Sequence, residues 1–262
     1  MEKVRLNKFI SHNTNFSRRE ADELLASGKV SVNGRVAKLG DEVSQNAGEK
    51  DGEKVRVNGR LIHQKKQFSA ILYHKPKGEL VSKRDDRGRR TIFESLPSKF
   101  KGFVSVGRLD FASEGLLILT DAPAIANALE KSDIEREYYV KVKGSVKPEV
   151  FEAMREGFEA SDATKGGHAK SKITSMKFAP FLAFGVVSAS GGYTRLKVIL
   201  SEGQNREIRR FFGCFDLEVV ELKRTAFGRM NLGTLGEGKW RFFTASEYED
   251  LRDFLQVSKV RW

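Results

Sequence analysis

The stretch Val106–Asp121, VGRLDFASEGLLILTD, decides how the larger part of this 262-residue chain is organised. An Arg-Leu-Asp turn at residues 108–110 leads through Gly115 into the apolar run Leu116–Leu119. If the turn is extended, Arg108 and Asp110 share one side of the chain. A carboxylate near guanidinium groups stays ionised and can act as a nucleophile or a base. The alternative is structural, with Asp110 capping a turn and pairing with Arg108, and the residues alone favour it.

Outside this segment, residues 68–262 alternate expected strands with expected helices. Alternation between apolar and polar residues predicts the strands Ile71–His74, Tyr138–Val142, Arg195–Ser201 and Leu217–Arg224. Apolar residues at helical spacing predict the helices Asp121–Leu129, Pro148–Arg155, Asn205–Phe212 and Ser246–Leu255. Ser246, with Glu249 three residues later, suits the N-cap of the last helix. The pattern predicts a mixed α+β domain and leaves the strand order open.

Residues 1–62 predict a small α/β unit of their own, and the basic segment 63–67, HQKKQ, is interpreted as a linker. Ser17 followed by Glu20 is a capping box that starts a helix. Two stretches alternate apolar and polar residues around Asn-Gly, the strongest short signal for a hairpin: VSVNGRVA (30–37) and VRVNGRLI (55–62).

The composition narrows the class of protein. Lys and Arg total 47 against 35 Asp and Glu, a net charge of +12 that favours a polyanionic partner such as nucleic acid. The single cysteine, Cys214, excludes an intramolecular disulfide and a cysteine-cluster zinc site, and the four histidines lack metal-ligand spacing. The chain has no apolar run long enough to span a membrane and no signal-peptide pattern at its start, so we expect a cytoplasmic protein.

The N-terminal unit gathers positive charge at its helix start and first hairpin, in Arg18, Arg19, Lys29 and Arg35. Such a cluster can bind phosphates, although a merely solvated charged face is about as common. The segments RLNKFIS (5–11) and SRREADELLASGKVSVNGRVAKLGDEV (17–43) resemble the S4-type RNA-binding domain, with Asn7 where that family often has Asp. The resemblance implies two helices and a small sheet that dock onto structured RNA.

The segment GRLDFASEGLLILT (107–120) resembles the catalytic motif of the pseudouridine synthases that modify ribosomal RNA. That motif reads Gly-Arg-Leu-Asp, two variable residues, Thr, one variable residue, Gly-Leu-Leu. Ser113 replaces the threonine and keeps its hydroxyl. The resemblance maps the essential aspartate of the family onto Asp110, with Arg108 beside it, and implies a catalytic domain whose mixed, mainly antiparallel sheet is flanked by helices.

Further blocks of the same family follow in order: YHKPKG (73–78), VS (81–82), DRGRRT (86–91), EYYV (137–140), EGQNREIRR (202–210) and LKRTAFGRMNLGTLGEGKWRFFT (222–244). By resemblance, Tyr138 stacks on the target base and Arg209 pairs with Asp110. The RNA contacts that we predict in this domain are Lys75, Lys77, Arg206 and Arg210. Each block also has a plain structural interpretation: a basic turn, a core tyrosine, or a solvated helix face carrying Arg206, Arg209 and Arg210.

The resemblance therefore predicts an isomerase that converts a uridine of ribosomal RNA into pseudouridine without metal or cofactor. The target nucleotide would be flipped from its stack, after which Asp110 attacks the ribose, attacks the base, or removes a ribose proton. We favour large-subunit RNA within precursor ribosomal particles as the substrate, and a monomeric enzyme. The alternative is a non-catalytic RNA-binding assembly factor, which would not need Asp110, Tyr138 and Arg209 together. A tRNA-charging enzyme is disfavoured, because adenylate-forming signatures are absent.

Overall fold

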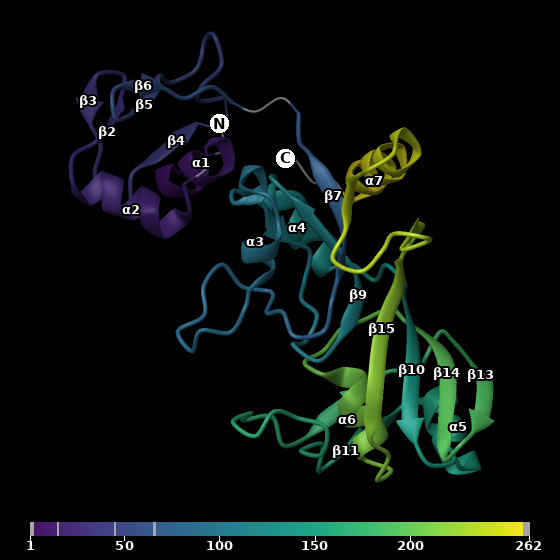
Figure 1. Cartoon of the computed structure of the whole chain (residues 1–262). Coiled ribbons are helices and arrows are strands. Elements are labelled where there is room, and N and C mark those ends of the chain that lie inside the picture. The colour runs from purple at the N-terminus through teal and green to yellow at the C-terminus, as the bar shows by residue number, and fades with distance from the viewer. Residues whose placement is uncertain (1–2, 15, 45, 65–66, 259–262) are drawn as a thin grey trace.

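A computed structural model of the chain describes residues 3–14, 16–44, 46–64 and 67–258. Figure 1 shows a small N-terminal domain joined to a larger domain built on one long sheet. The expected linker at 63–67 includes residues 65–66, which lie outside the described residues.

Within its described residues, the N-terminal domain contains two helices and two small antiparallel sheets, whose orders are β3-β2-β5-β6 and β1-β4. Its elements are β1 (Lys3–Arg5), α1 (Leu6–Asn13), α2 (Arg18–Ala26), β2 (Val30–Val32), β3 (Arg35–Val36), β4 (Glu42–Ser44), β5 (Val55–Val57) and β6 (Arg60–Leu61). The capping box at Ser17 and Glu20 is present, and Asn33 and Asn58 take the positive φ that both predicted hairpins require. The local signals of this domain are therefore confirmed.

The main sheet of the second domain has nine strands within the described residues, in the order β13-β14-β10-β15-β9-β7-β17, with β16 on β15 and β8 on β9. Its strands are β7 (Ala70–Lys75), β8 (Val104–Ser105), β9 (Glu114–Thr120), β10 (Arg136–Lys143), β13 (Ala183–Ser190), β14 (Tyr193–Leu200), β15 (Val219–Phe227), β16 (Met230–Asn231) and β17 (Trp240–Phe242). β15 and β9 run parallel, whereas the other strand pairs described in this sheet are antiparallel. The predicted mixed, mainly antiparallel α+β fold is confirmed.

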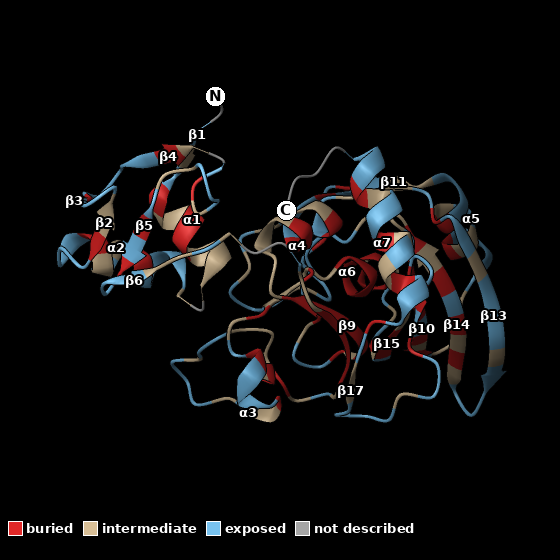
Figure 2. Ribbon diagram, turned by 90° about the horizontal axis from the view of Figure 1, so that it is seen from above, coloured by how far each residue is buried: buried red, intermediate tan, exposed pale blue. Residues whose placement is uncertain are grey.

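Helices lie on both faces of this sheet. Figure 2 shows that β9 is buried along its length, whereas β14 alternates buried and partly exposed residues and β13 is largely exposed. The helices are α3 (Ile92–Ser95), the 3-10 turn η1 (Ser98–Phe100), α4 (Pro123–Glu130), α5 (Pro148–Glu156), α6 (Glu207–Gly213) and α7 (Ala245–Val257); a separate hairpin joins β11 (Phe158–Ala160) and β12 (Met176–Phe178). α5 and α6 pack on one face of the sheet, and α4 and α7 on the other. The helix predicted from Ser246 begins at Ala245 instead, because Thr244 and Glu247 form its capping box.

The apolar run of the opening segment becomes β9, a central strand that is buried on both faces. Leu117 and Leu119 belong to one hydrophobic core, while Leu116 and Ile118 belong to the other. A continuous apolar run is what a strand buried on both sides requires. β9 therefore anchors the loop before it, which carries Asp110, at the centre of the domain.

Candidate active site

Asp110 lies in the loop between β8 and β9, in a turn that the backbone closes. The Ser113 amide donates to the Asp110 carbonyl at 3.0 Å. Ser113 is almost fully buried, and its own carbonyl accepts a hydrogen bond from Lys75 Nζ at 2.8 Å. The turn is thus tied to the end of β7, and the Asp110 side chain stays partly exposed.

Two arginines meet the Asp110 carboxylate. Arg206 Nη1 lies 3.4 Å from Asp110 Oδ2, and Arg209 Nε lies 3.6 Å from the same oxygen. Arg209 also donates to the Val219 carbonyl at 2.8 Å and to the Ser113 hydroxyl at 3.3 Å. The hydroxyl that Ser113 shares with the threonine of the family motif therefore has a partner in the site. Two guanidinium groups therefore face the Asp110 carboxylate.

Both arginines come from the start of α6, where the backbone fixes their direction. Arg206 is the N-cap and has a left-handed conformation with φ 53°, and its Nε donates to the Gly166 carbonyl at 2.7 Å. Arg209 lies one turn further into the helix. The sequence predicts Arg209 as the partner of Asp110 and assigns Arg206 to RNA. The structure brings both to the carboxylate. Their spacing of three residues places them on one face of a helix, and this signal could have identified Arg206 as a second partner.

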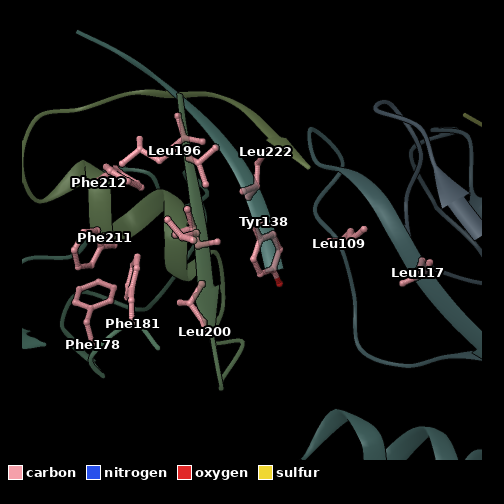
Figure 3. Close-up of a cluster of buried hydrophobic side chains, with 14 of the residues drawn as sticks. Leu109, Leu117, Tyr138, Phe178, Phe181, Leu196, Leu200, Phe211, Phe212 and Leu222 are labelled. Atoms are coloured by element: carbon pink, nitrogen blue, oxygen red, sulfur yellow. The ribbon is translucent and has the colours of Figure 1, made fainter. Parts of the chain in front are cut away.

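Asp110 and Tyr138 line one cavity of about 210 Å³, together with Arg206 and the apolar side chains of Leu109, Leu200 and Leu222. Tyr138 stands on β10 and is 8 % exposed. In Figure 3 its ring lies at the edge of the hydrophobic cluster, on the side towards Leu109, with its hydroxyl directed away from the phenylalanines. Its hydroxyl makes no hydrogen bond with any described residue. The cavity therefore combines a carboxylate with an aromatic ring and apolar walls.

Arg108 is exposed and lines the same cavity, but the structure gives it no ion pair with Asp110 among the described residues. The partner suggested by proximity in sequence is replaced by arginines from almost a hundred residues further along the chain. The structural interpretation of an Asp110–Arg108 pair is wrong.

Two of the predicted RNA contacts are buried, which is a correction to the sequence analysis. Lys75 is fully buried, and burial lowers the pKa of its ammonium to about 8. Arg210 is fully buried and donates to the carbonyls of Asn205 and Ile173 and to the Ser171 hydroxyl. Neither side chain lies on the outer surface or lines the cavity that contains Asp110, so both leave the predicted contact set.

The other predicted contacts lie on the surface. Arg18 and Arg19 are exposed at the first turn of α2, and Lys29 and Arg35 are exposed near the first hairpin. Lys77 is exposed in the turn that follows β7. These five side chains are free to meet phosphate, and their role as RNA contacts stays a prediction.

Sequence reasoning missed the charged groups deeper in the cavity wall. Glu207 is 5 % exposed, accepts a hydrogen bond from the Gln204 amide at 2.8 Å, and lies beside Glu202. Burial raises the pKa of the Glu207 carboxyl to about 7. Arg136 and Arg224 are 5 % and 3 % exposed in the same wall. The two arginines stand in strands, where no local pattern marks a buried charge.

No group of His, Cys, Asp and Glu side chains in the described part of the chain could hold a metal ion. Nor does any described helix have the length and apolar character needed to cross a membrane.

Comparisons with known proteins agree across nearly the whole chain. A sequence model of the RNA pseudouridylate synthase family matches residues 69–213, and a model of the S4 domain matches residues 4–48. An uncharacterized RNA pseudouridine synthase of Helicobacter pylori strain 26695 is 46 % identical over 96 % of this chain and 95 % of its own length. The ribosomal large subunit pseudouridine synthase B of Bacillus subtilis strain 168 is 32 % identical over 95 % of both chains. A crystal structure of a pseudouridylate synthase superposes with a TM-score of 0.60 at 25 % identity, covering 95 % of this chain and 99 % of that one.

Proposed function

This chain belongs to the RNA pseudouridylate synthase family, and from that premise we propose that it isomerises a uridine of large-subunit ribosomal RNA to pseudouridine with Asp110 as the essential carboxylate. The observation that carries the proposal is that Asp110, which is paired with Arg206 and Arg209, lines one cavity with Tyr138. The large subunit is proposed because similar proteins, such as that of Bacillus subtilis, are named ribosomal large subunit pseudouridine synthase B. We place the reaction in the cytoplasm, on precursor ribosomal particles, with a monomeric enzyme.

The reaction itself explains why such a cavity is useful. The bond between N1 and C1′ of the ribose breaks, the bond between C5 and C1′ forms, one proton leaves C5 and one arrives at N1. Because N1 and C5 lie in a stacked base, the nucleotide must first be flipped into the protein. The Tyr138 ring offers the flipped uracil a stacking surface, and Leu109, Leu200 and Leu222 exclude water around it.

Asp110 acts on the nucleotide that the cavity holds. Its carboxylate is paired with Arg206 and Arg209 and is positioned through the Ser113 turn, so it can attack the ribose or the base, or take a ribose proton. The N-terminal domain would dock the RNA through Arg18, Arg19, Lys29 and Arg35, and Lys77 would contact it near the cavity.

The test has two parts. Pseudouridine is mapped in the ribosomal RNA of cells that lack the gene, where one site is expected to be lost, and its position names the substrate. The purified Asp110→Asn variant, an isosteric change, is then expected to form pseudouridine at that site at least about 10³-fold more slowly, while its RNA affinity stays near that of the wild type. Ser105→Ala, on β8, is the control.

An unchanged pseudouridine map, together with no conversion by the wild type in vitro, would leave an RNA-binding assembly factor as the function. A wild-type rate in Asp110→Asn would instead remove Asp110 from the chemistry.

A further inference from the structure

Arg224 is a buried cation that the proposed chemistry does not yet use. Its side chain is 3 % exposed in the middle of β15, and its Nε donates to the Leu116 carbonyl at 2.8 Å. Nη2 is buried and has no hydrogen-bond partner within the described residues, and no described carboxylate forms an ion pair with this guanidinium. An unsatisfied buried donor destabilises a protein, so its retention calls for a ligand or a role.

Arg224 stands directly beside Tyr138. The two residues are paired across β10 and β15, and paired residues of antiparallel strands project on the same face at about 5 Å. Both line the cavity that contains Asp110. A pyrimidine stacked on the Tyr138 ring would therefore lie within reach of the Arg224 guanidinium.

The backbone holds Arg224 at this place through Gly115 of the opening segment. β9 and β15 approach so closely there that a Cβ on Gly115 would lie 2.2 Å from the Arg224 carbonyl oxygen. Gly115 also has φ 118°, which side chains rarely adopt. The glycine five residues after Asp110 thus brings the strand that carries Arg224 against the catalytic loop.

Arg136 is a second buried arginine of the cavity wall, and its guanidinium is occupied by hydrogen bonds to the backbone. It donates to the carbonyls of Ile134, Glu130 and Ser132 at 2.9–3.1 Å and to that of Ser201. Arg224 has one such bond. The difference assigns Arg136 to holding the chain and leaves the terminal nitrogens of Arg224 for another acceptor.

Resting on the proposed function, we propose that Arg224 donates a hydrogen bond to a carbonyl oxygen of the flipped uracil, and so reads the base and stabilises it once the bond to ribose breaks. When N1 keeps the electron pair of that bond, the negative charge of the detached base spreads onto O2 and O4. A buried guanidinium placed at either oxygen stabilises that charge more strongly than it stabilises the neutral base. Its donors also disfavour a cytosine amino group, which is itself a donor, at the O4 position.

The experiment replaces the acceptor and the donor in turn. Substrate RNAs carry uridine, 4-thiouridine or 2-thiouridine at the target position, because sulfur is a weak hydrogen-bond acceptor. Each RNA is given to the wild type, to Arg224→Met, and to Arg229→Met, a matched control that removes an exposed arginine just beyond the same strand. We expect Arg224→Met to lower kcat on uridine by about 100-fold with a KM close to that of the wild type.

The decisive readout is the ratio of rates on uridine and on the thio-substituted RNAs. One thio substitution is expected to slow the wild type and Arg229→Met, and to have little further effect on Arg224→Met; which substitution does so names O2 or O4. Arg224→Met is also expected to melt no lower than the wild type, because it removes a buried charge that has no counter-ion. If it fails to fold, Arg224→Lys is compared in the same way and should keep part of the sensitivity.

Equal thio effects in the wild type and in the Arg224 variant overturn this inference and leave the proposed function intact; a contact from Arg224 to a phosphate would give that result. A wild type that converts no uridine in any ribosomal RNA transcript overturns the proposed function, and the inference falls with it.

Discussion

The two domains share an excess of positive charge but place it differently. Residues 1–67 hold 14 Lys and Arg against 9 Asp and Glu, and residues 68–262 hold 33 against 26. Each Lys and Arg described in the N-terminal domain keeps solvent contact, whereas the catalytic domain buries Lys75, Arg136, Arg209, Arg210 and Arg224. The net charge therefore favours a polyanionic partner, but it does not tell which Lys and Arg side chains are accessible to that partner. Exposed cations are free to attract phosphate, whereas the buried ones contact carbonyls or a carboxylate, or, as proposed for Arg224, a ligand in the cavity.

The largest effect on stability is expected from Arg210→Met, which tests whether a buried cation holds the chain. Arg210 joins α6 to the loop 163–173 through the carbonyls of Ala163 and Ile173 and the Ser171 hydroxyl. Removing the guanidinium leaves these acceptors without a hydrogen-bond donor, so the free energy of unfolding should fall by about 3 kcal/mol. Chemical denaturation measures the loss, with the exposed Lys172→Met of the same loop as control. A loss no larger than that of the control would mean that burial of Arg210 has no structural purpose.

The role of the exposed arginines of the N-terminal domain is tested by combining Arg18→Ala with Arg19→Ala. Losing two phosphate contacts should weaken RNA binding by about tenfold at 0.1 M salt and reduce the slope of log affinity against log salt by about 1.5. Binding titrations at several salt concentrations measure both quantities. Lys50→Ala with Lys54→Ala, equally exposed in the same domain, is the control. An unchanged slope in the arginine variant would show that α2 does not face RNA.

A smaller effect concerns how pH acts on the catalytic domain. Burial raises the pKa of Glu207 to about 7, so the folded state favours the protonated form, and this contribution to stability is lost as the pH rises from about 4.5 through 7. Glu207→Gln should therefore melt increasingly above the wild type between pH 5 and pH 8. Every tyrosine and tryptophan of the chain follows residue 67, so intrinsic fluorescence reports this domain alone. A difference in melting temperature between the two proteins that stays constant from pH 5 to pH 8 would contradict the raised pKa of Glu207.

The N-terminal domain should respond to pH in the opposite direction. Burial, helped by the charges of Lys8 and Arg18, lowers the pKa of His12 to about 4. The folded state then favours the neutral ring, and the stability it contributes is lost as the pH falls from 6.5 towards 4. NMR titration of the His12 imidazole protons measures this directly. A His12 that titrates near 6.5 would remove the contrast between the domains.

Signals that act over a few residues could be interpreted correctly from the sequence. The capping box at Ser17 and the Asn-Gly hairpins form within one turn of chain, so their geometry does not depend on distant partners. The alternation of apolar residues likewise predicts β7, β10, β14 and β15 of the main sheet, although β15 ends three residues later than expected, and it misses β13. The order of those strands was not predictable, because pairing depends on contacts between segments far apart.

At the site, the sequence by itself determined that a carboxylate stands in a turn before a buried strand, since Asp110 and the run after Gly115 are adjacent in the chain. Only the tertiary structure decided which cations surround it. Arg206 and Arg209 reach Asp110 while Arg210 turns into the loop 163–173, and Lys75 and Arg224 are buried. A buried cation keeps its charge only where the surrounding segments provide hydrogen-bond acceptors or leave room for a ligand. Those segments lie far from the cation in the sequence, so no local pattern predicts them.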